Sequence, residues 1–470
     1  MSKPPNINVL IIQTDEQSCW TLGAYGGELV ETPHIDSIGA EGVCFDNFFT
    51  VSAVCTPSRG CFLTGRYPHS HKAFRNNEQI GRDELTLAHV LRDAGYDTGY
   101  AGKWHLNGGD HAEWIAPDDA MGFDDCRHMF NGGHQKSVVV PPEGGPPVKS
   151  RDMGDEKTHM TDWLADRTIE FINQPRTQPF FYMLSIPDPH GPFRARAPYD
   201  TMFDPDAMPI PDSFNEAHFP DWAEHDSWGR NGQYPLDLPD REDKLRRVKA
   251  QYCGMVKHID DCVGRILDAL RTEGTLDDTV VVFTSDHGDY MGEHGLAAKN
   301  NLYDSVYRIP LLIRWPKRIS GGTVVRPIVS IIDFQQSLLS LLGIPPCGRE
   351  QGRDATPLIL GEDVDWTEEV FIHPSDVPRA GIITPEYELA YVGRGWGEGW
   401  GKNAPEFKDH ILFDRIDDPK QMHNLFLDPA KQNVIGSLMA RIVAHYCAVE
   451  SPLVPWLEER SRAHLTGNCP

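Results

Sequence analysis

The chain has 470 residues, of which 40% are hydrophobic and 24% charged, which is an ordinary globular composition. Its length allows one large core with a smaller domain, or two or three ordinary domains. It carries 69 acidic and 44 basic side chains, so its formal net charge is −25. A surface this acidic repels nucleic acid and anionic lipid and excludes both as expected partners, but a locally positive pocket can still bind an anionic substrate.

No segment contains the roughly 20 consecutive apolar residues that a membrane-spanning helix needs. The first apolar run, Val9 to Ile12, is too short for the apolar region of a signal peptide and is typical of a strand. We therefore expect a cytoplasmic protein, or a periplasmic or secreted one if a leader has been removed. The ten cysteines include no CxxC pair, so neither a zinc site nor a disulfide framework is predicted.

Apolar runs alternate with helical patterns along the chain, which predicts a mostly parallel sheet covered by helices. The expected strands are residues 8–14, 97–101, 180–186, 280–285 and 311–314. The expected helices are residues 85–94, 162–173, 244–271 and 332–342. Three segments rich in proline, glycine and aspartate are expected to be long functional loops, at residues 108–157, 187–241 and 393–407.

The most informative segment is residues 54–65, which read Val-Cys-Thr-Pro-Ser-Arg-Gly-Cys-Phe-Leu-Thr-Gly. The structural alternative is a buried cysteine ahead of a helix, because Thr-Pro-Ser-Arg is a fair helix start. The segment resembles the signature of the type I sulfatases of the alkaline phosphatase superfamily: Cys, any residue, Pro, Ser and Arg, followed by Leu-Thr-Gly. The resemblance implies that a formylglycine-generating enzyme oxidises Cys55 to formylglycine, and that Arg59 holds this side chain and offsets negative charge.

Formylglycine explains turnover better than an ordinary hydroxyl does. Its hydrated form has two geminal hydroxyls, one of which attacks the sulfur. The second then loses its proton, so that sulfate is expelled and the aldehyde forms again. A serine would leave a stable sulfate ester with no internal route to release.

Two carboxylate clusters follow predicted strands. Asp15 and Glu16 come after the first strand, and Asp286 and His287 come after the strand at 280–285. Loops at the carboxyl ends of the strands of an open α/β sheet gather in space, so these clusters can meet. Either cluster alone could equally be a polar turn. Together they can supply oxygen ligands for a hard divalent cation.

The resemblance sharpens this metal site and also shows a departure from the family pattern. It implies a ligand set of Asp15, Glu16, Cys55 as formylglycine, Asp286 and His287. Many sulfatases have two consecutive aspartates at the first cluster, so direct ligation by the longer Glu16 stays open. One calcium ion is expected, but magnesium or manganese stays open because the imidazole of His287 suits softer ions.

Three further motifs resemble the sulfate-binding and proton-transfer elements of the family. Lys103 and His105 lie two residues apart after a strand and point the same way in an extended segment; the resemblance gives them sulfate contact and formylglycine regeneration. His190, in Pro-Asp-Pro-His-Gly-Pro, matches the histidine that protonates the leaving oxygen. Lys299 matches a second sulfate-binding lysine. A solvated lysine and a histidine in a rigid loop are the plain structural alternatives.

The C-terminal residues 411–425 resemble a family element that belongs to a small antiparallel sheet. The resemblance therefore implies an alkaline-phosphatase-like α/β/α sandwich with a smaller C-terminal α+β domain. Because residues 345–361 are spaced by proline and glycine, we place the catalytic domain at 1–360 and the smaller domain at 361–470.

The implied reaction is hydrolysis of an organic sulfate monoester, with a sulfated sugar or oligosaccharide as the expected substrate. A phosphonate monoester hydrolase or phosphodiesterase is the first alternative. It shares the formylglycine and the Asp-His pair, but that group lacks the Lys-x-His element. A catalytically silent sugar-binding homologue is the second alternative, although a binding protein would not need intact Cys55, Arg59, Lys103, His105 and His190.

Overall fold

The computed structural model describes residues 7–109, 113–141, 147–216, 220–222, 238–373, 375, 379–393 and 409–465. Its main sheet has eight strands. From one edge to the other they are β11 (Thr323–Val325), β2 (Val43–Phe45), β10 (Leu311–Arg314), β9 (Thr279–Ser285), β1 (Asn8–Asp15), β8 (Phe180–Pro189), β4 (Asp97–Lys103) and β5 (Asp125–Phe130). All five strands expected from the sequence lie in this sheet.

Most of the sheet is parallel. The strands from β9 through β1, β8 and β4 to β5 run in one direction. Only β10 among the expected strands breaks the pattern, because it pairs antiparallel with both β9 and β2. The central strands are continuous apolar runs, as expected for strands that are covered on both faces.

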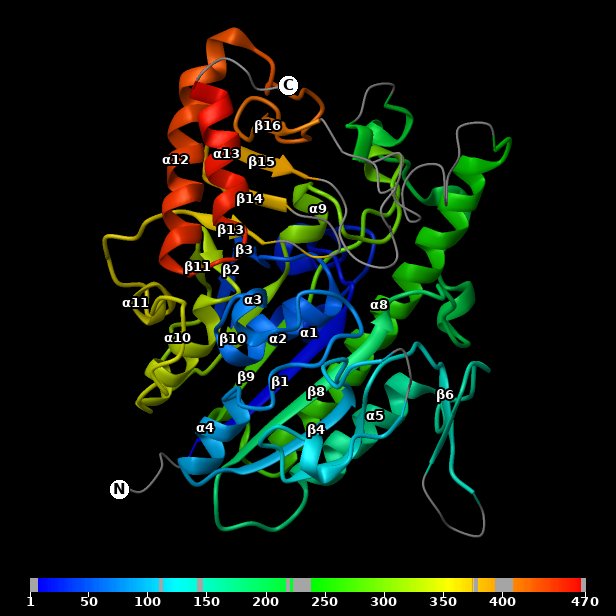
Figure 1. Cartoon of the computed structure of the whole chain (residues 1–470). Helices are drawn as coiled ribbons and strands as arrows, with labels where there is room; N and C mark the ends of the chain where they lie inside the picture. The colour runs from blue at the N-terminus through cyan, green and yellow to red at the C-terminus, as the bar shows by residue number, and fades with distance from the viewer. Residues whose placement is uncertain are drawn as a thin grey trace.

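Helices cover both faces of the sheet (Figure 1). Alternate residues of β1 enter different cores: Val9 and Ile11 face one, and Leu10 and Ile12 face the other, all fully buried. The first core also contains side chains of α2 (Cys55–Thr64), α4 (Leu87–Asp93) and α10 (Asp333–Leu342). The second contains side chains of α1 (Pro33–Ala40), α5 (Met160–Ile172) and α8 (Arg241–Thr272). This is the expected α/β/α sandwich.

The C-terminal part forms a second, smaller layer. Its antiparallel sheet consists of β13 (Val370–Ile372), β14 (Arg379–Ile383), β15 (Tyr387–Val392) and β16 (Ile411–Asp414). The helices α12 (Gln432–Ala448) and α13 (Val454–Leu465) share a core with this sheet. Figure 1 shows both helices beside its strands. The short antiparallel sheet expected from the resemblance is present, and the domain boundary near Gly361 stays a prediction.

The remaining described elements are short and connect these layers. They are α3 (Pro68–His71), α9 (Asp304–Tyr307), α11 (Thr356–Ile359), β3 (Phe48–Phe49) and β12 (Val329–Ser330), together with single turns of 3-10 helix. None of the helices in the described ranges is both long and apolar enough to cross a bilayer. None of the described cysteines forms a disulfide.

Two of the expected loops contain regular structure, and the prediction for them was wrong. Residues 108–157 include the edge strand β5 and a hairpin of β6 (Ser137–Val139) and β7 (Val148–Ser150). These strands are short and partly exposed, so their sequences lack the long apolar run that identifies a central strand. Strand β8 continues to Pro189, and short 3-10 helices follow it. Of the third expected loop, residues 394–407 lie outside the described residues.

A buried carboxyl group in the small sheet gives a test of this part of the fold. Glu388 of β15 is fully buried, and Gln421 donates a hydrogen bond of 2.6 Å to it. Burial and the nearby Asp304 raise the pKa of Glu388 from its ordinary value of 4.5 to about 8. The unfolded chain therefore ionises this group at a lower pH than the folded chain does, and stability is lost as the pH rises through this window.

We predict that Glu388→Gln stabilises the protein increasingly from pH 5 to pH 8, by at most about 1.4 kcal/mol for each pH unit. Urea unfolding at several pH values measures the difference. The exposed Glu386→Gln is the matched control and should track the unmodified protein. A constant difference between Glu388→Gln and the unmodified protein at all pH values would contradict the burial argument.

Candidate active site

Four neighbouring parallel strands deliver the expected site residues to one edge of the sheet. β1 ends at Asp15 and lies in register with β9, so that Thr14 pairs with Ser285 and Asp286 follows directly. On the other side of β1 runs β8, which leads to His190, and then β4, which ends at Lys103. The carboxyl ends of parallel strands meet at one edge, so residues far apart in sequence become neighbours.

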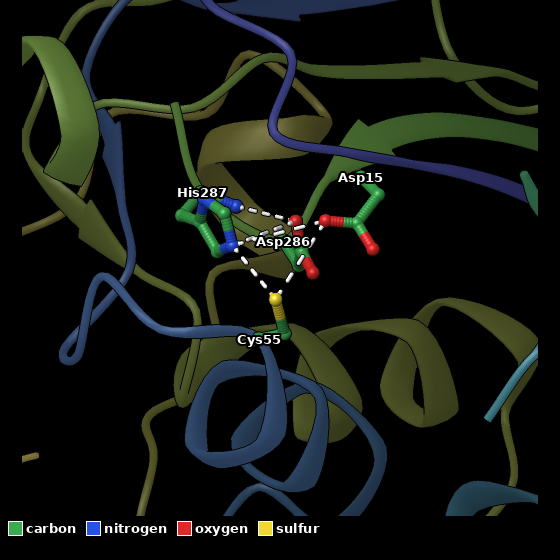
Figure 2. Close-up of side chains that lie close together, drawn as sticks. All are labelled: Asp15, Cys55, Asp286 and His287. Atoms are coloured by element: carbon green, nitrogen blue, oxygen red, sulfur yellow. Dashed lines mark hydrogen bonds and ion pairs between the residues drawn. The ribbon is translucent and has the colours of Figure 1, made fainter. Parts of the chain in front are cut away.

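Cys55 enters this edge from the first turn of α2, where the backbone amides of the helix favour negative charge. Its Sγ lies 3.2 Å from His287 Nε2 and 3.7 Å from Asp15 Oδ1. Figure 2 shows the side chains of these residues and Asp286 converging from three segments of the chain. One ligand atom from each of the four lies within 4.8 Å of the others, and all four side chains are buried.

These four groups fit a divalent cation. The Nδ1 atom of His287 donates to the Gly288 carbonyl over 2.9 Å, which leaves Nε2 facing the cluster. Asp15 and Asp286 supply carboxylate oxygens, and an oxygen in place of the Cys55 sulfur would add another. Two carboxylates, an imidazole and a further oxygen form a donor set suited to calcium, magnesium or manganese.

Arg59 holds the two carboxylates of this cluster. Its side chain is only 1% exposed. The guanidinium lies 3.1 Å from Asp15 Oδ2 through Nη2 and 2.9 Å from Asp286 Oδ2 through Nε. Its other terminal nitrogen donates to Ser185 Oγ over 2.7 Å and to Gln13 Oε1 over 3.1 Å. The planar fork of an arginine is needed to contact so many acceptors at once.

The position of the Cys55 sulfur is strongly electropositive. Burial and Asp15 would both raise the pKa of the thiol. The side chains of Lys103, Lys299 and His287 outweigh them and hold the pKa well below its usual range. The Nζ atom of Lys103 lies 3.6 Å from the sulfur. In a protein of net charge −25, this edge of the sheet therefore favours an anion.

Glu16, the neighbour of Asp15 in the chain, contacts two other expected site residues. Its Oε2 lies 3.0 Å from His190 Nε2 and 3.3 Å from Lys299 Nζ. Glu16, Asp15 and His190 lie close enough together to bind a metal ion, but Glu16 is not part of the cluster that contains Cys55. The backbone of Glu16 is left-handed, with φ of 68°. Direct ligation of a metal by Glu16 stays a prediction.

His105 follows β4 in a turn of unusual backbone geometry. It has a φ of 57°, and its Nε2 lies 3.1 Å from Asn77 Oδ1. Just before Lys103, Gly102 has a φ of 107°, and a Cβ there would lie 1.8 Å from the carbonyl oxygen of Ser185. Only glycine allows β4 to approach β8 this closely at the point where the site begins.

The small C-terminal sheet also contributes to the site. Lys299 lies between Ala298 and Asn300, which both have left-handed backbones, with φ of 55° and 82°. Arg379 of β14 donates to the Asn300 carbonyl and, over 3.1 Å, to its side-chain oxygen. Ser375 donates to the same side-chain oxygen over 2.5 Å. No motif in the sequence indicated that a residue of the C-terminal sheet anchors the segment that carries Lys299.

The structure thus brings all the residues expected from the sequence to one edge of the sheet. Cys55, Asp15, Asp286 and His287 form one cluster. Around it lie the remaining residues, which are Glu16, Arg59, Lys103, His105, His190 and Lys299. Sequence reasoning missed Gln13 and Ser185, which hold Arg59, as well as Arg379 and a histidine, His134, which covers His190.

Comparison with known proteins identifies the family of the chain. The family model described as Sulfatase matches residues 7–344, and a second, described as N-sulphoglucosamine sulphohydrolase, C-terminal, matches residues 292–446. The chain is 27% identical to the N-acetylglucosamine-6-O-sulfatase of Bacteroides thetaiotaomicron, over 89% of this chain and 82% of that protein.

Solved structures share the fold. One is described as BT4656 in complex with its substrate D-glucosamine-2-N,6-O-disulfate, with a TM-score of 0.76, 24% identity and coverage of 94% of this chain and 98% of that one. Another is the phosphonate monoester hydrolase of Silicibacter pomeroyi, with a TM-score of 0.72, 23% identity and coverage of 94% and 95%. At this level of identity the likeness concerns the fold alone.

An α/β/α sandwich with a buried cysteine, carboxylate and imidazole cluster at its strand ends defines a hydrolase of the alkaline phosphatase superfamily. Within it, the chain belongs to the type I sulfatase family. It is therefore a sulfuric ester hydrolase, as the motif around Cys55 indicated. The family implies a metal ion and a formylglycine, and the buried cluster is able to bind a metal.

We predict that Arg59→Met lowers the free energy of unfolding by about 3–5 kcal/mol in chelator-treated protein, because it removes a cationic partner from two buried carboxylates, of which Asp15 alone keeps a lysine, Lys103. A divalent cation should recover more of this stability in the variant than in the unmodified protein. Urea unfolding with and without calcium measures both effects. Arg66→Met is the control, since its partner Glu84 is buried but Arg66 is 22% exposed; it should cost less and show no added dependence on calcium. Equal losses with and without cation would contradict the assignment.

Proposed function

We propose that the protein hydrolyses a sulfate monoester of a sugar to the free alcohol and inorganic sulfate, using a formylglycine made from Cys55. The observation that carries the proposal is the set of positively charged groups around the buried Cys55 sulfur. This sulfur lies 3.6 Å from Lys103 Nζ and 3.2 Å from His287 Nε2, at the start of a helix and within the possible metal cluster. Such a site suits the attack on an anionic ester and the charge that develops in it.

A divalent cation held by Asp15, Asp286 and His287 would supply Lewis-acid stabilisation of charge on sulfate and nucleophile oxygens. Calcium is the expected ion, with magnesium or manganese as alternatives. Arg59 keeps both carboxylates aligned toward the cation. Cys55 is 1% exposed, so we infer that a formylglycine-generating enzyme acts on it before the chain folds.

The positions of the other side chains suit sulfate binding and proton transfer. Lys103, which contacts Asp15, and Lys299, which contacts Glu16, bind sulfate oxygens. His105 lies on the Lys103 side and can take up a proton from the nucleophile position when sulfate departs. His190 lies on the Lys299 side, where both side chains contact Glu16, and donates a proton to the leaving oxygen.

A sugar sulfate is the substrate class that the relatives support best. The relative in Bacteroides thetaiotaomicron is named for the 6-O-sulfate of N-acetylglucosamine. The acidic surface of this chain, with a net charge of −25, disfavours long polyanionic polysaccharides. We therefore propose a sulfated monosaccharide or short oligosaccharide.

Hydrolysis of a phosphonate monoester is the second candidate. The pair Asp286 and His287 is common to that group, and a phosphonate monoester hydrolase shares the fold. The positions of Lys103 and His105 at the nucleophile favour sulfate instead, because that group lacks the Lys-x-His element. Both reactions pass through an anionic centre, so some activity toward both is expected.

The deciding experiment compares turnover of an aryl sulfate, an aryl phosphonate monoester and glucosamine 6-sulfate by one preparation. Mass spectrometry first establishes conversion of Cys55, and Cys55→Ala serves as the inactive control. We expect sulfate esters to be the better substrates, and chelation to abolish turnover until a divalent cation is restored. A converted enzyme that prefers the phosphonate would overturn the sulfatase proposal but leave the nucleophile assignment standing.

Lys103 gives a sharper test of substrate choice. We predict that Lys103→Met lowers kcat/KM for sulfate esters by roughly 10²-fold or more, as for the loss of one donor to a developing oxyanion. Turnover of the phosphonate should fall less. Lys72→Met, which removes a lysine that is 59% exposed in a surface ion pair, is the control. Equal losses for both substrate classes would show that Lys103 does not discriminate between them.

A further inference from the structure

A second imidazole covers the ring of His190. The rings of His134 and His190 are parallel within 2°, and their centroids lie 3.6 Å apart. His134 belongs to the connection between β5 and β6, inside a segment that the sequence predicted to be a loop. No motif points to it, because one histidine among twenty carries no signal of its own.

The connection that carries His134 is anchored at both ends. At one end, the Asn131 carbonyl accepts a hydrogen bond of 2.8 Å from the backbone of His105. At the other end, Lys136 donates to Asp188 over 2.6 Å, and both of these side chains are buried. Gly133, just before the histidine, turns the chain with a φ of 90°. The backbone that carries the His134 imidazole is therefore held in place on both sides.

The hydrogen bonds of His190 both lie in the plane of its ring. Its Nδ1 donates to the Gly191 carbonyl over 2.8 Å, and its Nε2 lies 3.0 Å from Glu16 Oε2. When Nε2 gives its proton to a leaving oxygen, it must exchange the contact with Glu16 for that oxygen. During this exchange the ring keeps only one hydrogen bond, and the stacked His134 opposes rotation of the ring out of its plane.

We propose that His134 is a positioning residue: by stacking on His190 it keeps the Nε2–H bond of the general acid directed at the leaving oxygen. This inference rests on the proposed function. In the step concerned, the bond from sulfur to the leaving oxygen breaks, and the proton on His190 Nε2 passes to that oxygen. Burial and the neighbouring His190 hold the pKa of His134 well below its usual range, so the stacked ring adds no positive charge.

The test is the dependence of kcat/KM on the leaving group, from 4-nitrophenyl sulfate to phenyl and alkyl sulfates. A misplaced general acid harms poor leaving groups, which need the proton, and spares good ones. We expect His134→Ala to lower kcat/KM roughly three- to tenfold more for phenyl sulfate than for 4-nitrophenyl sulfate, in keeping with the strength of one aromatic pair. His134→Phe, which retains a stacking ring, should show the same slope as the unmodified enzyme in a plot of log kcat/KM against the pKa of the leaving group.

A double substitution shows whether His134 acts through His190. In His190→Ala, which has the steepest dependence, adding His134→Ala should change the slope no further. His445→Ala is the matched control: it removes an imidazole stacked on Phe371 at 3.7 Å and 1°, within the C-terminal core, and should leave the slope unchanged. If His134→Ala fails to fold, His134→Leu fills the volume without an aromatic face and should steepen the slope equally.

The outcomes separate this inference from the proposed function. If the converted, unmodified protein hydrolyses no sulfate ester, the proposed function fails and the inference fails with it. If the unmodified protein is active but His134→Ala changes all substrates by the same factor, or none of them, only the positioning role is overturned. A steeper slope that persists in His134→Phe would also overturn it, because stacking would then not be the cause.

Discussion

Arg59, buried between Asp15 and Asp286, is the interaction on which the rest of the site depends. Two carboxylates that are removed from water repel each other strongly, and neither can stay ionised in a dry interior without a counter-charge. The guanidinium meets both, at 3.1 Å and 2.9 Å, while Gln13 and Ser185 use its remaining donors. The charged cluster can therefore exist at the centre of a sandwich whose strands are otherwise apolar.

The sheet places the partners of Arg59. The ends of β9, β1, β8 and β4 are adjacent, and one or two functional side chains lie at or just after the end of each strand, at the same edge of the sheet. Helix α2 closes the arrangement by bringing Cys55 in from the face of the sheet, with the positive end of its backbone at the nucleophile. The site is thus assembled at the ends of packed strands and at the start of a helix, which suits a reaction that needs fixed distances.

The electrostatics of the molecule work at two scales. Globally the chain is strongly acidic, with a formal charge of −25, yet the sulfur of Cys55 lies among lysines, an arginine and an imidazole. The positive groups near Cys55 attract an anion, while the acidic surface of the protein repels it. This combination favours small anions over large polyanions, which must approach much of the surface. Among the described residues, the connection that carries His134 reaches the proposed general acid, His190.

The sequence by itself determined the fold class, the central strands and nearly all members of the site. Those strands are long apolar runs, and motifs such as Cys-Thr-Pro-Ser-Arg or Lys-Trp-His keep their chemistry within a few residues. Only the tertiary structure decided what no local pattern carries. The edge strand β5 and the β6–β7 hairpin are too short and too exposed to leave a periodic signal. The stacking of His134 on His190 and the anchoring of Asn300 by Arg379 join residues more than 50 positions apart. Such contacts depend on how elements pack, and packing is a property of the folded chain rather than of any segment of it.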